Sequence, residues 1–289
     1  MSKEFVAGVS FSDDTAQTAI FKVREDNVEL QYLSEHTKKD GGELWFFDAL
    51  FGLKGRKVRK ISRVSVAIDN SLALTHTFPL DCTLTQTEQN EHVQWETSNF
   101  LPDYRPQDFI NDLHTLQTDI QEGVSQVSVV TVRRSMIHNI QRSLTEHGLE
   151  IHILDTNHFG AEYALLRGYP ENKTKTTALV CISRNRMDVG ILEQGQLKSY
   201  RFAMVSSVEE GRKFIGGLKL DTTFRDVFLY GTSVLPGFLA AIRSMSGVKV
   251  TLLNPFRRIN VASSCREFDQ FIGKEYRFSA CTGIALRKE

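Results

Sequence analysis

Apolar and polar residues alternate in short runs at the start of the chain, and these runs predict strands. Three of them are separated by short polar turns, which is typical of an antiparallel meander. They are residues 4–10, 17–24 and 28–34. Apolar residues then recur at helical spacing within 43–53, and another strand-like run covers 62–68. The opening of the chain therefore predicts a meander, a helix and a strand.

The same order of elements appears again about 170 residues later. Three strand-like runs, a helical stretch and a fourth strand follow one another, although few residues match those of the first set. These elements are 177–182, 187–192, 197–204, 207–218 and 226–230. Two copies of one supersecondary unit predict an α/β protein with mixed sheets, two lobes and a cleft between the lobes.

The first copy is followed by an insertion. A strand-like run at 72–79, a helix at 86–100 and a Pro-containing loop come first, and the chain then returns through strands and helices. The returning elements are 126–132, 133–147, 149–154 and 158–167. We therefore predict a first lobe at 1–172 with an inserted subdomain at about 70–125, a hinge at 168–176 that has no apolar run, and a second lobe at 173–289.

Composition and charge exclude several classes of function. Basic and acidic residues each number 35, so the formal net charge is zero and nothing in it favours nucleic-acid binding. The four cysteines are too far apart for a disulfide framework or a zinc site, which fits a reduced cytosolic compartment. The N-terminus lacks a signal-peptide core, and no apolar run approaches a membrane span. We expect a soluble protein that reaches a membrane through a partner.

Several short strings of the chain resemble the actin-like PilM family of type IV pilus assembly proteins, which are relatives of the cell-division protein FtsA. They are Phe78–Leu80 with Glu91–Glu96 and Asn99–Pro102, Thr131–Arg134 with Gly148–Asp155, Gly231–Gly237, and Val248–Phe256. The resemblance implies an actin-like, ribonuclease H-like fold of two lobes. The cytoplasmic domain of a type II secretion L-protein is the nearest alternative family, so the apparatus served stays open.

The resemblance also implies two phosphate-binding hairpin turns, each with an Asp that organises hydrated magnesium. In this chain the expected Asp positions are Gly8 and Cys181, and the bulky Phe11 enters the first turn. The residues that would contact a nucleotide, if one binds, are Ser10, Ser12, Ser183, Asn185, Gly231, Thr232 and Ser233. Asp13-Asp14 as a displaced metal pair, and Arg184 with Arg186 as phosphate ligands, are alternatives to ordinary solvated turn residues.

The short segment between Met204 and Gly231 also argues against a working nucleotide site. The resemblance implies a lid-type subdomain of the second lobe between Met204 and Gly231, but 27 positions separate these residues, enough for one helix and one strand. We therefore expect a pseudo-ATPase with no catalytic residue, no metal and no cofactor. The alternative is an ATP-binding actin-like ATPase or nucleotide switch that uses the interlobe cleft.

The resemblance implies a partner as well. PilM-like proteins lie under the inner membrane and capture the short cytoplasmic tail of a bitopic PilN-type protein, in a groove between the first lobe and the insertion. Mapped onto this chain, the tail contacts are Phe78, Leu80, Trp95, Phe100, Leu101 and Pro102, beside strand 126–132. The alternative is that these residues fill the core of the insertion. The basic run Arg56–Lys60 is a solvated turn or a contact to an acidic lipid or partner, and the oligomeric state stays open.

Overall fold

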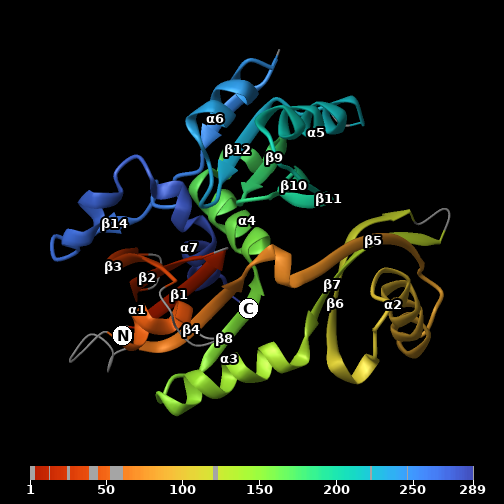
Figure 1. The fold of residues 1–289 in the computed structure, drawn as a ribbon, viewed down its shortest axis with the longest axis horizontal. Helices are drawn as coiled ribbons and strands as arrows, with labels where there is room; N and C mark the ends of the chain where they lie inside the picture. The colour runs from red at the N-terminus through yellow and green to blue at the C-terminus, as the bar shows by residue number, and fades with distance from the viewer. Residues whose placement is uncertain are drawn as a thin grey trace.

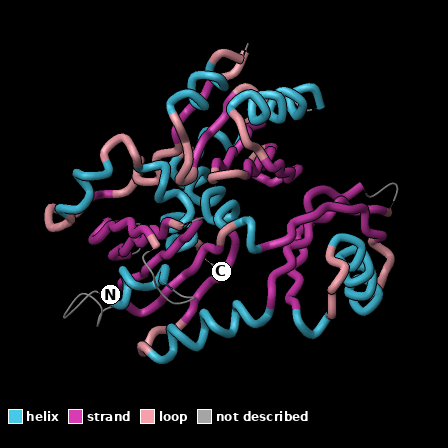
Figure 2. Tube along the Cα trace, viewed as in Figure 1, coloured by secondary structure: helices cyan, strands magenta, loops and turns pink. Residues whose placement is uncertain are grey.

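Three β sheets organise the chain in the computed structural model (Figures 1 and 2). The structure describes residues 4–12, 14–24, 27–38, 45–52, 61–119, 123–221, 223–245 and 247–288. Asp13 and the basic run Arg56–Lys60 lie outside these ranges.

The first sheet has the order β14-β3-β2-β1-β4-β8. Its strands are β1 (Glu4–Ser12), β2 (Thr15–Arg24), β3 (Asn27–Thr37), β4 (Ile61–Ile68), β8 (Ile151–Thr156) and β14 (Asn260–Val261). β1, β2 and β3 form the predicted antiparallel meander, whereas β4 is parallel to β1 and β8 is parallel to β4. The 3-10 turn η1 (Trp45–Phe47) and the short α1 (Asp48–Phe51) replace the helix predicted at 43–53.

The second sheet repeats this topology in the order β11-β10-β9-β12-β13. Its strands are β9 (Thr176–Ile182), β10 (Arg186–Glu193), β11 (Gln196–Met204), β12 (Asp226–Tyr230) and β13 (Lys249–Leu252). The first three are antiparallel, and β12 and β13 extend the sheet in parallel. α5 (Val208–Asp221) and α6 (Pro236–Arg243) pack against its core. The same strand order in two sheets confirms the predicted duplication.

The inserted subdomain is an antiparallel three-stranded sheet with one helix on one face (Figure 1). Its elements are β5 (Ala73–Asp81), α2 (Gln86–Phe100), β6 (Phe109–Asp119) and β7 (Val124–Arg133), with the strand order β5-β7-β6. The helix starts at a capping box between Thr85 and Glu88. α3 (Arg134–Glu146) then leads back to β8. β6 is missing from the elements that the sequence predicts.

Two helices cross between the large sheets. α7 (Ser279–Leu286) packs on the first sheet and α4 (Asn157–Gly168) packs on the second. They touch closely because both carry glycine at the crossing: a Cβ on Gly283 would lie 1.8 Å from the carbonyl oxygen of Gly160.

The C-terminal segment corrects the predicted division of the chain. The second lobe was expected to include every residue from 173 to 289, but β14 pairs with β3 and α7 covers β1 and β4 of the first sheet. All eight residues of α7 are buried, so this helix needs an apolar surface on several sides, and the first sheet supplies one of them. No pattern in the sequence indicated that the chain returns to the first sheet.

The segment predicted as a hinge is packed. α4 ends at Gly168, and η5 (Pro170–Thr174) continues to β9. The ring of Tyr169 lies edge-on against Phe228, with 4.8 Å between ring centroids. Shorter 3-10 turns complete the fold: η3 (Asn70–Leu72), η4 (Pro106–Asp108), η6 (Arg266–Phe271) and η7 (Glu275–Phe278).

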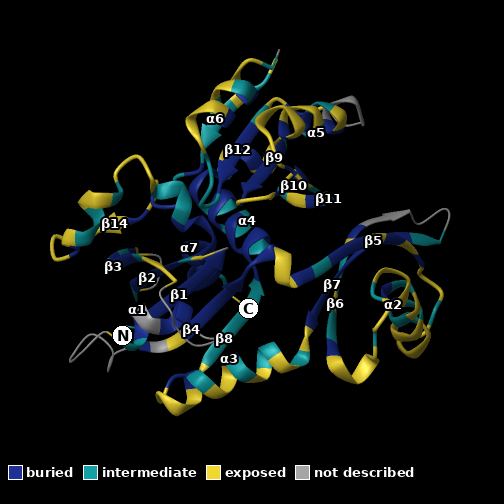
Figure 3. Cartoon of the chain, viewed as in Figure 1, coloured by how far each residue is buried: buried dark blue, intermediate teal, exposed yellow. Residues whose placement is uncertain are grey.

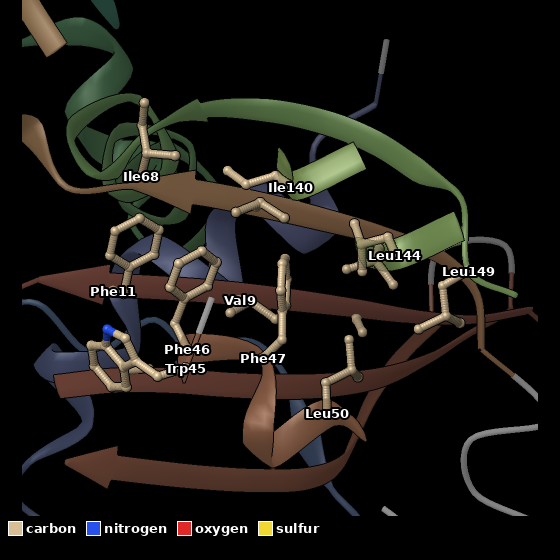
Figure 4. Close-up of a cluster of buried hydrophobic side chains, with 14 of the residues drawn as sticks. Val9, Phe11, Trp45, Phe46, Phe47, Leu50, Ile68, Ile140, Leu144 and Leu149 are labelled. Carbon is tan, nitrogen blue, oxygen red and sulfur yellow. The ribbon is translucent and has the colours of Figure 1, made fainter. Parts of the chain in front are cut away.

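Alternation along β1 gives the two faces of the first sheet different neighbours. Ala7, Val9 and Phe11 face a core formed with η1, α1 and α3 (Figure 4). Val6 faces the opposite core, which includes α7. Gly8 and the side chain of Ser10 therefore also face α7.

Candidate functional site

The first hairpin, between β1 and β2, uses its polar groups internally. A Cβ on Gly8 would lie 1.9 Å from the carbonyl oxygen of Cys281, so α7 fills the space where a larger side chain would stand. The buried Ser10 hydroxyl donates to Gln17 Oε1 at 3.2 Å. The ring of Phe11 stacks on Phe46 with 4.0 Å between centroids. Ser12 is also buried, whereas Asp14 is exposed at the tip.

The second hairpin, between β9 and β10, holds a buried ionic group. Arg186 Nε donates to Asp188 Oδ1 at 2.8 Å, and the Tyr200 hydroxyl donates to the same oxygen at 2.6 Å. The Arg186 guanidinium also lies 3.9 Å from the ring centroid of Phe202. Arg186, for which the sequence favoured a solvated turn, is therefore an interior side chain. Burial raises the pKa of the neighbouring Cys181 thiol well above its usual value.

The strand registers show which positions of the two hairpins correspond. In the first hairpin, Ser12 pairs with Thr15 and Ser10 pairs with Gln17. In the second, Ser183 bonds to Arg186 and Cys181 pairs with Asp188. Cys181 therefore corresponds to Ser10, two residues beyond the expected Gly8. Neither of the corresponding positions carries a carboxylate.

The glycine turn after β12 packs on the second hairpin. Gly231 has a φ of 113°, and a Cβ there would lie 2.4 Å from the carbonyl oxygen of Ile182. The Ser233 amide donates to that same oxygen at 3.1 Å. This turn, which includes Thr232, therefore packs on the hairpin between β9 and β10. In that hairpin the Ser183 hydroxyl donates to the Arg186 carbonyl, and Asn185 is exposed. Ser10 and Ser12 belong to the hairpin of the other sheet.

A cavity of about 240 Å³ separates the inserted subdomain from the first sheet. We call it the junction groove. Its lining comes from β4, β6, β7, α3 and β8, and it is mostly apolar. The lining residues are Ile68, Ile110, Asn111, Asp112, Val130, Val132, Ile137, Leu154, Asp155 and Thr156. β6 is an edge strand of the small sheet and β8 is an edge strand of the first sheet, so the groove lies beside two strand edges.

A family model for the type IV pilus assembly protein PilM matches residues 2–203. The chain belongs to the PilM family. No curated protein matches the sequence significantly. Among the residues that the structure describes, no helix is both long enough and apolar enough to cross a bilayer.

Similar solved structures identify the fold of this PilM-family chain. A PilM–PilN type IV pilus biogenesis complex aligns over 98% of both chains, with 17% identity and a TM-score of 0.77. A Bacteroides thetaiotaomicron protein of actin-like ATPase fold aligns over 88% of this chain and 92% of its own, with 14% identity and a TM-score of 0.56. The cytoplasmic domain of EpsL, an inner-membrane component of the Vibrio cholerae type II secretion system, aligns over 94% of both chains, with 9% identity and a TM-score of 0.53. The fold is actin-like.

The tail contacts expected from the sequence lie elsewhere on the insertion of this PilM-family chain. Phe78 and Leu80 are buried beneath α2, on the face of the small sheet opposite the groove. Trp95 and Phe100, both on α2, are 59% and 54% exposed. Figure 3 shows exposed positions along this helix. Leu101 is half-buried and Pro102 exposed after the helix. None of these six lines the junction groove.

The groove residues that the sequence analysis missed sit mainly on β6 and β8, and α3 adds Ile137. In β6, apolar residues fall at positions 109, 110, 113 and 116, which hides the period of two that identifies a strand. One signal was available. Strand 126–132 is apolar on both faces at Val127, Val129, Val130 and Val132, and a strand with two apolar faces needs two covering layers.

Proposed function

We propose that this PilM-family chain is a non-enzymatic scaffold of a type IV pilus assembly apparatus, and that it binds the cytoplasmic tail of a PilN-type membrane partner in the junction groove. The tail would hold the protein at the cytoplasmic face of the inner membrane. The family supports the pilus role, and the solved complex of a PilM with PilN supports the kind of partner.

The observation that carries the proposal is the position of the groove between two strand edges. An edge strand presents unpaired backbone N–H and C=O groups. An extended peptide can pair with such an edge while its side chains occupy neighbouring apolar pockets. Here β6 and β8 offer the edges, and Ile110, Ile137 and Leu154 offer apolar contacts. A short extended tail fits this surface better than a folded domain does.

The hairpins support the non-enzymatic part of the proposal. A phosphate site of the actin type needs a carboxylate for magnesium and free donors for the phosphate oxygens. The corresponding positions are Ser10 and Cys181, and the hydroxyls of Ser10 and Ser183 are already used inside the protein. α5 is the described element between β11 and β12, and its Ile215 and Leu218 pack on the core of the second lobe. These features favour a pseudo-ATPase.

The tail-binding part is tested with a fluorescein-labelled peptide of the cytoplasmic segment of the PilN-type protein encoded in the same genome. Fluorescence anisotropy should show saturable binding to the full chain. Ile110→Asp, which places a charge in the groove, should weaken binding at least tenfold. Leu235→Asp, an exposed position of the second lobe (62% exposed), serves as the matched control and should leave the affinity unchanged. Equal binding by both variants would contradict the groove as the site.

The pseudo-ATPase part is tested by thermal unfolding with Mg-ATP, with ADP and without nucleotide. Nucleotide present at 100 times its dissociation constant would stabilise the folded state by about 2.7 kcal/mol. We expect no shift at millimolar Mg-ATP. A magnesium-dependent rise of the melting temperature would instead support a nucleotide switch.

A further inference from the structure

Two of the groove residues are carboxylates on different walls. Asp112 comes from β6 and Asp155 from β8, and none of the described residues that line the groove carries a positive charge. An apolar groove whose only charges are negative selects against acidic occupants. The charge of the groove therefore says something about the sequence that can bind there.

The partners of these carboxylates face away, into a second cavity. His114 Nε2 lies 3.1 Å from Asp112 Oδ2, and Arg287 forms an ion pair with Asp155. His114 and Arg287 both line a cavity of about 430 Å³ bounded by β6, α4 and the turn between β10 and β11. Two ion pairs thus form the boundary between the junction groove and this second cavity.

A third carboxylate, in the second cavity, has a buried oxygen with no hydrogen bond to any residue that the structure describes. Glu162, on α4, lines the cavity, and its Oε2 atom is buried with no hydrogen bond. Burial, together with the charge of Asp155, raises the pKa of Glu162 to about 7. The charged and titratable groups around it are Asp112 and His114 on β6, Asp155 on β8, Arg287 after α7 and Tyr163 on α4 itself. Three carboxylates thus share one arginine and one histidine.

We propose that the segment bound in the junction groove carries an arginine or lysine side chain that reaches between Asp112 and Asp155 to Glu162 in the adjoining second cavity, and that these three carboxylates take up its positive charge. The inference rests on the proposed function, because it describes the occupant of the same groove. A buried carboxylate without a partner is costly, and an incoming cation would supply the missing one. Cytoplasmic segments next to a membrane helix are also enriched in lysine and arginine.

The inference predicts that binding releases a proton. In the free protein Glu162 is half protonated near neutral pH, and a bound cation favours its ionised form. The pKa of His114 is raised by its hydrogen bond to Asp112, so a cation that competes for Asp112 favours the neutral histidine. Both effects have the same sign. The affinity should rise about tenfold from pH 6 to pH 8, as expected for one proton with a pKa of about 7.

The experiment compares the labelled PilN-type tail peptide with a neutral version, in which citrulline replaces each arginine and acetyl-lysine replaces each lysine. The natural peptide should bind the full chain at least tenfold more tightly at pH 8. Glu162→Gln, which keeps the shape and removes the charge, should remove most of this difference and most of the pH dependence. Asp112→Asn, at a largely exposed side chain, provides a second variant that does not depend on the interior. Glu91→Gln on the exposed face of α2 is the matched control.

The outcomes separate the inference from the proposed function. Equal affinity of the natural and neutral peptides would overturn the cation inference and leave tail binding intact. A natural tail that binds without any arginine or lysine would do the same. Failure of both peptides to bind would overturn the proposed function and the inference with it.

Discussion

The hairpins between the lobes and the groove beside the insertion treat their polar groups in opposite ways. In the hairpins the buried polar side chains bond to one another, as Ser10 does to Gln17 and Asp188 does to Arg186 and Tyr200. At the groove, Asp112 is largely exposed, and in the adjoining second cavity the Oε2 atom of Glu162 is buried with no hydrogen bond to any described residue. Hydrogen-bonded interior groups stabilise a fold, whereas a buried group without a hydrogen bond needs an explanation such as a role in binding; the hairpins also hold one such atom, Asp188 Oδ2.

This difference suggests where a duplicated actin-like fold keeps its binding capacity. The two sheets repeat one topology, so the hairpins Ser10–Gln17 and Cys181–Asp188 occupy corresponding places. Their side chains nonetheless belong to two different interiors, one mostly apolar and one ionic. The inserted subdomain interrupts the duplication, and the groove occurs at that interruption. Substitutions in the hairpins should therefore change stability, and substitutions in the groove should change binding.

The largest expected effect is at Asp188. Asp188→Asn removes the charge that compensates Arg186, whose side chain is only 10% exposed. Leaving one member of a buried ion pair costs about 3–5 kcal/mol. Urea denaturation should show this loss of unfolding free energy, with tail affinity unchanged at temperatures where the variant is folded.

The matched control for Asp188 is the double variant Asp188→Asn with Arg186→Gln. It removes both charges, so it should recover part of the lost stability. A single variant as stable as the parent would show that the buried pair contributes little, and would weaken the contrast between hairpins and groove.

The second largest effect is expected when the pH is lowered, because a buried histidine between the two lobes then destabilises the fold. His158, on α4, is fully buried against Tyr200 and Tyr230, and burial lowers its pKa to about 3. A histidine whose folded pKa lies below its unfolded value near 6.5 stabilises the fold at neutral pH and loses that contribution as the pH falls. The loss is about 1.4 kcal/mol per pH unit, or about 3 kcal/mol at pH 4.5. His158→Gln should flatten the dependence of unfolding free energy on pH between 6.5 and 4.5; an unchanged slope would contradict a neutral buried His158.

A smaller effect is expected at Gly8. Gly8→Ala would place a Cβ 1.9 Å from the Cys281 carbonyl and 2.8 Å from Ala285 Cβ, so α7 must move. Overpacking of this kind costs about 1–3 kcal/mol. Gly217→Ala on α5 is the control, because nothing lies within 4 Å of its added Cβ, and it should stabilise the helix by about 0.5–1 kcal/mol. If Gly8→Ala were as stable as the parent, α7 would not be fixed on the first sheet.

Local patterns predicted most elements of the fold. Strand β12 and helix α2 begin and end where periodicity placed them, at Asp226–Tyr230 and Gln86–Phe100. The duplicated order of the elements was also visible. The return of α7 to the first sheet was not visible, because a helix of small and apolar residues that is buried on every side shows no preferred face and so does not indicate its neighbour.

The groove was harder to predict for a related reason. Its lining comes from β4 and from the consecutive elements β6, β7, α3 and β8, whose folding onto one another no local pattern shows, and β6 lacked a strand-like period. Reasoning from the sequence placed the tail between the first lobe and the insertion, beside strand 126–132, but assigned the contacts to β5, α2 and the residues after α2, none of which lines the groove. Counted back from the two turns, Cys181 stands level with Ser10 rather than with Gly8, because a strand of alternating faces shows its period but not which positions correspond to those of its repeat. The expected Asp positions themselves stay a prediction.

The smallest change in stability and in tail affinity is expected for substitutions on the outer face of α2. These variants test directly whether the tail binds in the junction groove or on this helix. Trp95→Ala removes a side chain that is 59% exposed and touches mainly His92, at 5.8 Å between ring centroids. Surface truncations usually change stability by less than about 0.5 kcal/mol. The tail peptide should also bind this variant within twofold of the parent, whereas Ile110→Asp weakens binding at least tenfold. If Trp95→Ala or Phe100→Ala weakened binding more than Ile110→Asp did, the tail would lie across α2, and the acidic groove would need another occupant. Anisotropy titrations of the three variants, with circular dichroism to verify folding, decide between the two faces of the same small sheet.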